Sequence, residues 1–93
     1  MQKIMKTIVK EILTRNNLLK SNDAPRFQYG MLGRLKSDCD YFLGSGNRSK
    51  KYLWALDSAE QIKIMRALWL WLPVKPEWLT MEQINEYAKE MLN

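Results

Sequence analysis

The sequence predicts an all-α protein, a compact bundle of four helices with a glycine-rich basic loop between the second and the third. Apolar residues recur at intervals of three or four along most of the 93 residues. No stretch alternates apolar and polar residues as a half-exposed strand would, and there is no internal repeat or low-complexity tract. A chain of this length is too short for two independent hydrophobic cores, so one domain over residues 1–93 is expected.

The first helix is expected over about residues 2–20. Its apolar face would consist of Ile4, Met5, Ile8, Val9, Ile12 and Leu13, with lysines on the other side. Such a basic amphipathic helix can dock on a partner or a membrane surface, or it can be a core helix with a solvated charged face. The second interpretation is preferred.

A second helix is expected to begin within the segment SNDAPR, residues 21–26, and to end near Leu43. Serine, asparagine and aspartate accept hydrogen bonds from the free amides at a helix start, and proline is tolerated in the first turn. The buried positions would be Tyr29, Leu32, Leu35, Cys39 and Phe42. Arg34 with Asp38 and Lys36 with Asp40 are oppositely charged pairs four residues apart, which predicts ion pairs on the surface.

A glycine-broken loop, Gly44 to Asn47, should end this helix, because glycine and asparagine readily adopt positive φ. Arg48, Lys50 and Lys51 follow, close to Tyr52 and Trp54. A nucleotide-phosphate site is disfavoured, since the loop follows a helix and lacks the phosphate-loop spacing. The loop could contact a nucleic-acid backbone or an acidic protein surface, or it could be a solvated connector whose aromatic residues pack into the core.

The third helix is expected to start at Asp57, with Glu60 three residues later, and to stop before Pro73. Its apolar positions are Ile62, Ile64, Met65, Leu68, Trp69, Trp71 and Leu72. Leu70 instead falls on the polar face, between Lys63 and Arg66. It is either buried by the surrounding segments or displayed for a partner. Burial is preferred, because the connector carrying Trp78 is expected to fold over this end.

Two prolines make residues 73–78 an extended connector before the last helix. Thr80 is expected to be the N-cap with Gln83 completing a capping box, and Leu79 and Ile84 can form a hydrophobic staple. The inward positions would be Ile84, Tyr87, Ala88 and Met91.

The formal net charge of +5 is unevenly distributed along the chain. Residues 1–53 contain eleven Lys and Arg against four Asp and Glu, a net of +7, whereas residues 54–93 contain four against six, a net of −2. This asymmetry indicates an acidic protein partner or nucleic acid on the N-terminal side.

The composition does not favour catalysis or metal binding. There is no histidine, which removes the commonest general base, and the single Cys39 can build neither a zinc site nor an intramolecular disulfide. In mid-helix, Cys39 is expected to be an inert packed thiol. Lys6, Lys10 and Glu11 interrupt any signal-peptide core, and no apolar run could span a bilayer. A cytoplasmic protein without cofactor or enzymatic activity is expected.

Residues 29–48, YGMLGRLKSDCDYFLGSGNR, together with the later KPEWLT at residues 75–80, resemble the large polyvalent protein-associated domain of the eleventh type. The resemblance spans about residues 29–91 and leaves residues 1–20 outside. Members occur in large multidomain proteins of phages and conjugative elements of Gram-positive bacteria, and as short free-standing proteins. The resemblance implies a helical fold without a firmly assigned activity.

It also implies a mobile-element protein that inhibits a bacterial defence nuclease, with a CRISPR effector as the leading partner, by binding and occluding it in the host cytoplasm. The alternatives are a nucleic-acid-binding accessory of element DNA, or a module that self-associates through its first helix or Leu70. The expected contact residues for a protein or a DNA or RNA backbone are Arg34, Lys36, Asn47, Arg48, Lys50, Lys51, Tyr52, Trp54 and Leu70.

Overall fold

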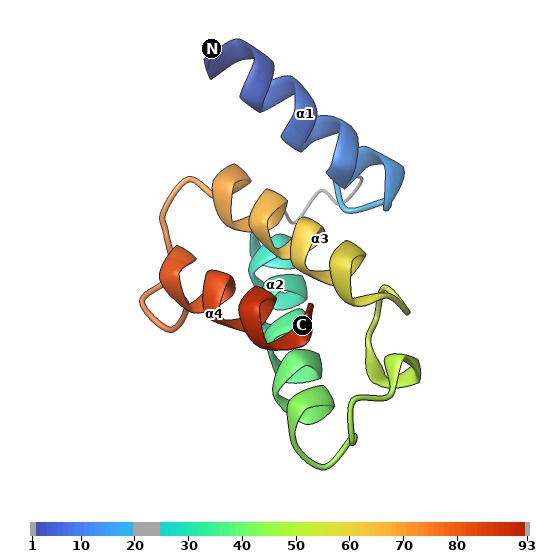
Figure 1. Ribbon diagram of the computed structural model, residues 1–93. Helices are drawn as coiled ribbons and strands as arrows, with labels where there is room; N and C mark the ends of the chain where they lie inside the picture. The colour runs from blue at the N-terminus through green and yellow to red at the C-terminus, as the bar shows by residue number, and fades with distance from the viewer. Residues whose placement is uncertain (1, 20–24, 93) are drawn as a thin grey trace.

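The computed structural model describes residues 2–19 and 25–92. Their order is α1 (Gln2–Arg15), α2 (Arg26–Leu43), the short 3-10 helix η1 (Lys50–Tyr52), α3 (Ser58–Trp71) and α4 (Met81–Met91) (Figure 1). No strand occurs in these ranges. The predicted all-α fold of four α-helices is therefore confirmed.

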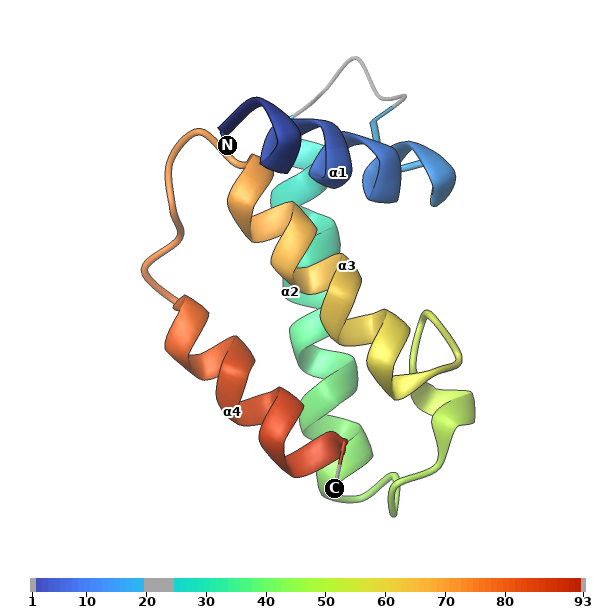
Figure 2. The same ribbon diagram turned by 45° about the horizontal axis from the view of Figure 1, so that its top comes forward.

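Helix α3 occupies the centre of the arrangement and packs against each of the other three α-helices. Helix α1 lies along α3 and forms the top of the molecule in Figure 2, with Arg15 near Glu60 at the start of α3 and Met5 near Leu70 toward its end. Helices α2 and α4 also run beside α3 and touch each other. The short η1 packs near the C-terminal end of α2. Helix α1 and the η1 loop thus lie at opposite ends of the molecule.

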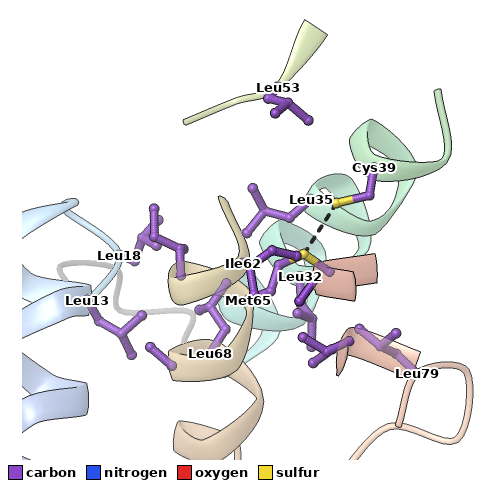
Figure 3. Packing of buried hydrophobic residues seen from close by; sticks show 14 of the residues in the cluster. Leu13, Leu18, Leu32, Leu35, Cys39, Leu53, Ile62, Met65, Leu68 and Leu79 are labelled. Atoms are coloured by element: carbon purple, nitrogen blue, oxygen red, sulfur yellow. Dashed lines mark hydrogen bonds between the residues drawn. The ribbon is translucent and has the colours of Figure 1, made fainter. Parts of the chain in front are cut away.

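The core is made where apolar faces of all four α-helices meet on α3. Leu13 and Leu18 reach from the α1 side toward Leu68 of α3, as Figure 3 shows. The predicted inward residues Leu32, Leu35, Cys39, Phe42, Ile84, Ala88 and Met91 are buried. Tyr29 and Tyr87 are half-buried. The sequence did not predict that Gln28 is buried, where its side-chain amide donates to the Leu18 carbonyl at 2.9 Å.

Helix α1 ends at Arg15, several residues before the expected position near 20. Asn17 has φ 61, a left-handed conformation that asparagine tolerates. Its amide donates to the Thr14 carbonyl at 3.0 Å, and the Leu18 amide donates to the Leu13 carbonyl at 2.8 Å, which is the Schellman pattern. Leu13 and Leu18 are both buried by this turn. The burial of Leu18 therefore stabilises the end of the helix at this point.

The starts of α3 and α4 are as predicted. The Asp57 carboxylate accepts from the Glu60 amide at 2.9 Å, and Thr80 with Gln83 forms the complete capping box. Leu79 and Ile84 are both fully buried. Helix α2 begins after Pro25, which makes no side-chain cap; the predicted caps at residues 21–23 lie outside the described residues.

The expected burial of the C-terminal end of α3 is wrong. Leu70 is 41% exposed, Trp71 36% and Trp78 46%. The connector instead covers the side of α3 that carries Trp69, whose indole donates to the Leu79 carbonyl at 3.0 Å. Lys75 folds back on the helix end and donates to the carbonyls of Trp69, Leu70 and Leu72 at 2.8, 3.1 and 2.8 Å. These contacts hold the connector on one side and leave Leu70 displayed on the other.

Candidate partner-binding surfaces

The loop after α2 is shaped by close packing rather than by glycines with positive φ. Gly44 has φ −110, and the positive φ values belong to Asn47 at 55 and Arg48 at 60. Gly46 is needed for another reason, because a Cβ there would lie 2.8 Å from the Tyr41 carbonyl oxygen and 2.9 Å from the Tyr41 ring. The prediction that glycines supply the left-handed turn is thus corrected, while that for Asn47 is confirmed.

Arg48 is directed toward the protein itself. Its guanidinium donates to the Glu90 carbonyl at 2.9 Å and to the Met91 carbonyl at 3.5 Å, and it lies 5.5 Å from the centre of the Phe42 ring. A cation at this position satisfies free carbonyls at the C-terminal end of α4 and favours the helix dipole. Arg48 therefore joins the loop to α4, and part of its positive charge interacts with the carbonyls at the end of that helix.

Lys50 and Lys51 remain exposed on η1, next to an exposed pair of tyrosines. The Lys51 ammonium lies 5.1 Å from the centre of the Tyr52 ring, and Tyr52 meets Tyr41 edge to face with ring centres 4.9 Å apart. Tyr41 and Tyr52 are 46% and 40% exposed. We call Tyr41, Lys50, Lys51 and Tyr52 the tyrosine platform. Sequence reasoning missed Tyr41, although at 100° per residue it falls opposite the inward face formed by Leu32, Leu35, Cys39 and Phe42.

The other predicted contact residues of this region are distributed differently. Trp54 is half-buried against the core, and its backbone amide donates to the Asp38 carboxylate at 2.9 Å. Lys36 forms the predicted ion pair with Asp40 at 3.2 Å. Arg34 is exposed on α2, but within the described ranges it forms no ion pair with Asp38, which is engaged by the loop. Asn47 is exposed in the loop.

The titratable groups beside α2 are arranged as structural contacts. Burial, and secondarily the charges of Asp40 and Asp38, raises the pKa of the Cys39 thiol to about 12. That thiol contacts the Met65 sulfur at 3.5 Å (Figure 3). The Tyr87 hydroxyl donates to Asp40, and burial together with this carboxylate raises the pKa of Tyr87 well above its usual range. Both groups therefore stay protonated at neutral pH, where neither is a nucleophile.

A second surface lies between α1 and α3, at the other end of the molecule. Two adjoining hollows of about 610 and 370 Å³ share Met5, Val9 and Leu70 in their walls. We call them together the α1–α3 groove. The remaining lining residues are Lys6, Trp71, Ile8, Ile12, Ala59, Ile62, Lys63, Arg66, Ala67 and Leu92. Sequence reasoning singled out Leu70 and kept docking through the first helix as an alternative, but it preferred to assign the apolar face of that helix to the core.

Much of the groove wall is apolar and open to solvent. Met5 is 54% exposed, Ile8 47%, Leu70 41% and Leu92 50%. Helix α1 uses only part of its apolar face for the core, through Val9 and Leu13, which are 7% and 0% exposed. The neighbouring apolar residues of α1 are therefore left facing the groove.

The charged residues of the groove are cationic. Lys6, Lys63 and Arg66 line it, and no carboxylate does so among the residues that the structure describes. Lys63 is paired with Glu60 at 3.5 Å. Arg66 donates to the neutral Asn85 side chain at 2.9 Å, so that contact leaves its positive charge unbalanced. The groove thus combines an apolar floor with an excess of positive charge.

Within residues 2–19 and 25–92, no three His, Cys, Asp or Glu side chains gather in a way that could hold a metal ion. None of the helices in those ranges is both long and apolar enough to cross a membrane.

Comparison with known proteins identifies the family but gives no characterised relative. Neither the curated proteins nor the solved structures contain a significant match to the chain. The family model described as large polyvalent protein-associated domain 11 matches residues 25–91, which comprise α2, η1, α3 and α4 and leave α1 outside. This agrees with the resemblance noted for residues 29–91. The chain belongs to the family of large polyvalent protein-associated domain 11.

Proposed function

We propose that this chain is a non-enzymatic interaction module of mobile genetic elements, which acts by covering part of a partner protein. The observation that carries the proposal is the exposed apolar wall of the α1–α3 groove. Small soluble monomers rarely leave clustered apolar side chains in water unless a partner covers them. Leu70, on the polar side of α3, is the clearest case, because nothing in the packing of the four helices needs a leucine there.

The proposed partner is a bacterial defence nuclease, with a CRISPR effector as the first candidate. Support for this target comes from the family alone, because the resemblance implies proteins of phages and conjugative elements, which must survive such nucleases. A basic protein cannot imitate DNA by its charge. It would instead block an acidic protein surface that the nuclease needs for DNA binding or for its conformational change.

The test is a cleavage assay with purified CRISPR effectors of Gram-positive bacteria. The full chain is titrated against each effector beside two variants, Leu70→Glu in the groove and Val74→Glu, whose side chain is 70% exposed in the connector. We expect the unmodified chain and Val74→Glu to block cleavage and Leu70→Glu to have lost this effect. Full cleavage with no detectable binding across the panel would remove the nuclease as the target.

A second candidate function is binding of single-stranded nucleic acid at the tyrosine platform. The specific observation is the pair of exposed rings, Tyr41 and Tyr52, beside the Lys51 ammonium. Stacking of a base on an exposed ring contributes about 1–3 kcal/mol, and lysines attract the phosphates.

Fluorescence polarisation with labelled single-stranded DNA and RNA tests this function. Binding should weaken steeply as salt rises from about 50 to 200 mM. At a fixed salt concentration, Tyr52→Ala should bind the nucleic acid more weakly than the unmodified chain. Trp78→Ala, which removes an exposed aromatic residue outside the platform, should have little effect. An absence of binding at low salt excludes this function.

A further inference from the structure

We infer that the α1–α3 groove takes one amphipathic helix of a partner protein, three to four turns long, whose apolar face is flanked by aspartates and glutamates. The inference rests on the proposed function as an interaction module and narrows the chemistry of its partner. Three features of the groove support it: its helical walls, its length and its charge.

The walls favour a helix over an extended peptide. Both are α-helices, α1 and α3, whose backbone groups are already hydrogen-bonded within the helices. An extended peptide laid between them would bury amide and carbonyl groups without a sheet edge to pair with, and each such group costs free energy. A helical peptide satisfies its own backbone and offers only side chains to Met5, Ile8 and Leu70.

The length of the groove sets the length of the bound helix. The lining residues run from Ala59 to Trp71 on α3, which corresponds to about 18 Å at 1.5 Å per residue, and from Met5 to Ile12 on α1. A ligand helix lying along the groove can therefore use roughly three to four turns, with apolar residues at positions i, i+3 or i+4, and i+7. Met5 and Ile8, three residues apart on α1, provide one wall for these anchors, and Leu70 and Trp71 provide the other.

The charges of the groove select acidic flanks for this helix. Lys6, Lys63 and Arg66 are the charged lining residues, and Glu60 balances only Lys63 among them. Carboxylates beside the apolar face of a ligand would meet these cations, whereas lysines or arginines there would be repelled.

The same charges disfavour a second copy of this chain as the occupant. Two copies packed through α1 would bring Lys6, Lys10 and Arg15 of each against their counterparts, with Glu11 as the one carboxylate of α1 within residues 5–15. Helix α4 is acidic, but its exposed positions 82, 83, 85, 86, 89 and 90 are all polar. Neither helix joins an apolar face to acidic flanks, so the groove fits a different protein.

A display selection tests the inference on the full chain. The library consists of 14-residue sequences with a fixed helical apolar face and flanking positions that encode Asp, Glu, Lys, Arg and Gln at equal frequency. We expect the flanks of selected sequences to be enriched in Asp and Glu. Synthetic peptides of these sequences should become helical on binding, as measured by circular dichroism, and should bind more weakly at higher salt.

Matched variants then place the binding site. Leu70→Glu should weaken a selected peptide by about tenfold or more, as expected for the loss of one buried leucine contact, while Val74→Glu should not change its affinity. Lys6→Glu should weaken it severalfold, whereas Lys50→Glu, in η1 and outside the lining of the groove, should not. Circular dichroism and thermal unfolding show whether each variant is folded.

Four results would overturn the inference: no enrichment of any helix, enrichment of neutral or basic flanks, equal binding by Leu70→Glu, or a dimer of the chain that Leu70→Glu dissociates in light scattering. The proposed function fails separately. A chain that blocks a nuclease but selects no acidic helix acts through another contact, whereas a chain that binds acidic helices and blocks no nuclease has a different target.

Discussion

Asp38 and Asp40 are two residues apart on α2, and each ties that helix to a different part of the molecule. Asp38 accepts from the Trp54 amide in the η1 region, whereas Asp40 accepts from the Tyr87 hydroxyl of α4 and pairs with Lys36. Residues at this spacing point in different directions on a helix, so the two carboxylates serve separate contacts. Both are used to hold neighbouring segments in place rather than to share a proton or an ion.

Cys39 is expected to be unreactive in the folded protein, because burial and the neighbouring carboxylates raise the pKa of its thiol to about 12. Iodoacetamide at pH 8 should leave the native chain unlabelled over a time in which the chain in denaturant reacts completely. Mass spectrometry measures both. Rapid stoichiometric labelling of the native chain would show that the thiol is accessible and ionised.

Gly46→Ala is expected to destabilise the fold by about 1–3 kcal/mol, the usual cost of forcing an extra carbon into a packed site. The new Cβ would lie 2.8 Å from the Tyr41 carbonyl oxygen, which belongs to the backbone and cannot easily move. Urea denaturation measures the loss.

The matched control for this variant is Gly30→Ala. Gly30 lies within α2 and has no atom within 4 Å of the added Cβ. That variant should gain up to about 1 kcal/mol, because alanine is the better helix former. Equal effects of the two substitutions would contradict the packing role of Gly46.

At the scale of secondary structure, two of the helices end on a cation from a following or distant segment. Lys75, four residues after the end of α3, caps that helix, and Arg48 caps α4 from the loop after α2. Each contact satisfies carbonyls that a helix leaves free at its C-terminus. These caps decide where the connector and the loop lie, and through the connector they leave Leu70 exposed.

Lys75→Met should therefore lower the free energy of unfolding by about 1 kcal/mol, since it removes charge-assisted hydrogen bonds at a largely exposed site. It should also change the tryptophan fluorescence, because the ammonium lies 4.9 Å from the centre of the Trp69 ring. Chemical denaturation followed by fluorescence measures both effects. Lys50→Met, which removes an exposed lysine of η1, is the control and should leave stability and fluorescence unchanged.

Local sequence signals were sufficient for the helices whose ends depend on nearby residues. Asp57 and Thr80 cap amides three residues away, so the starts of α3 and α4 could be predicted. The end of α1 could not, because Leu19 lies seven residues after Ile12 and continues the apolar spacing, whereas the turn at Asn17 is stabilised by the burial of Leu18.

The surfaces were harder to predict than the helices, because they depend on distant contacts. Arg48 is directed to a carbonyl 42 residues away, a contact that no local pattern contains. The exposure of Leu70 depends on the side along which the connector runs. The sequence identified Leu70, Lys51 and Tyr52 as unusual, but it could not show that Leu70 shares a groove with Met5 or that Tyr52 meets Tyr41.

For the molecule as a whole, alkaline pH is expected to weaken the fold. Burial raises the pKa of Cys39 to about 12 from an ordinary value of 9.0. The pKa of Tyr87 is also raised, by burial and by its hydrogen bond to Asp40. A raised pKa means that the folded state keeps a proton that the unfolded chain loses. The stability contributed by the protonated thiol is thus complete below about pH 9 and is lost as the pH rises toward about 12.

Thermal unfolding of the reduced protein at a series of pH values between 8 and 11 measures this effect. The slope for the unmodified chain should be steeper than for Cys39→Ala by up to about 1.4 kcal/mol per pH unit, the value for one proton. Comparing the slopes, rather than the stabilities themselves, cancels the loss of packing free energy that Cys39→Ala causes at every pH. Parallel curves would contradict the raised pKa of the thiol.

The boundary of the family match runs through the α1–α3 groove, since α3 lies inside residues 25–91 and α1 lies before them. Val9 and Leu13 pack α1 against the core. Met5, Lys6 and Ile8 face the groove and take little part in that packing. Substitutions at these three positions can therefore change what the groove recognises while the family fold stays intact. Under the proposed function, α1 is therefore the part of the chain whose partner preference can change at the least risk to folding.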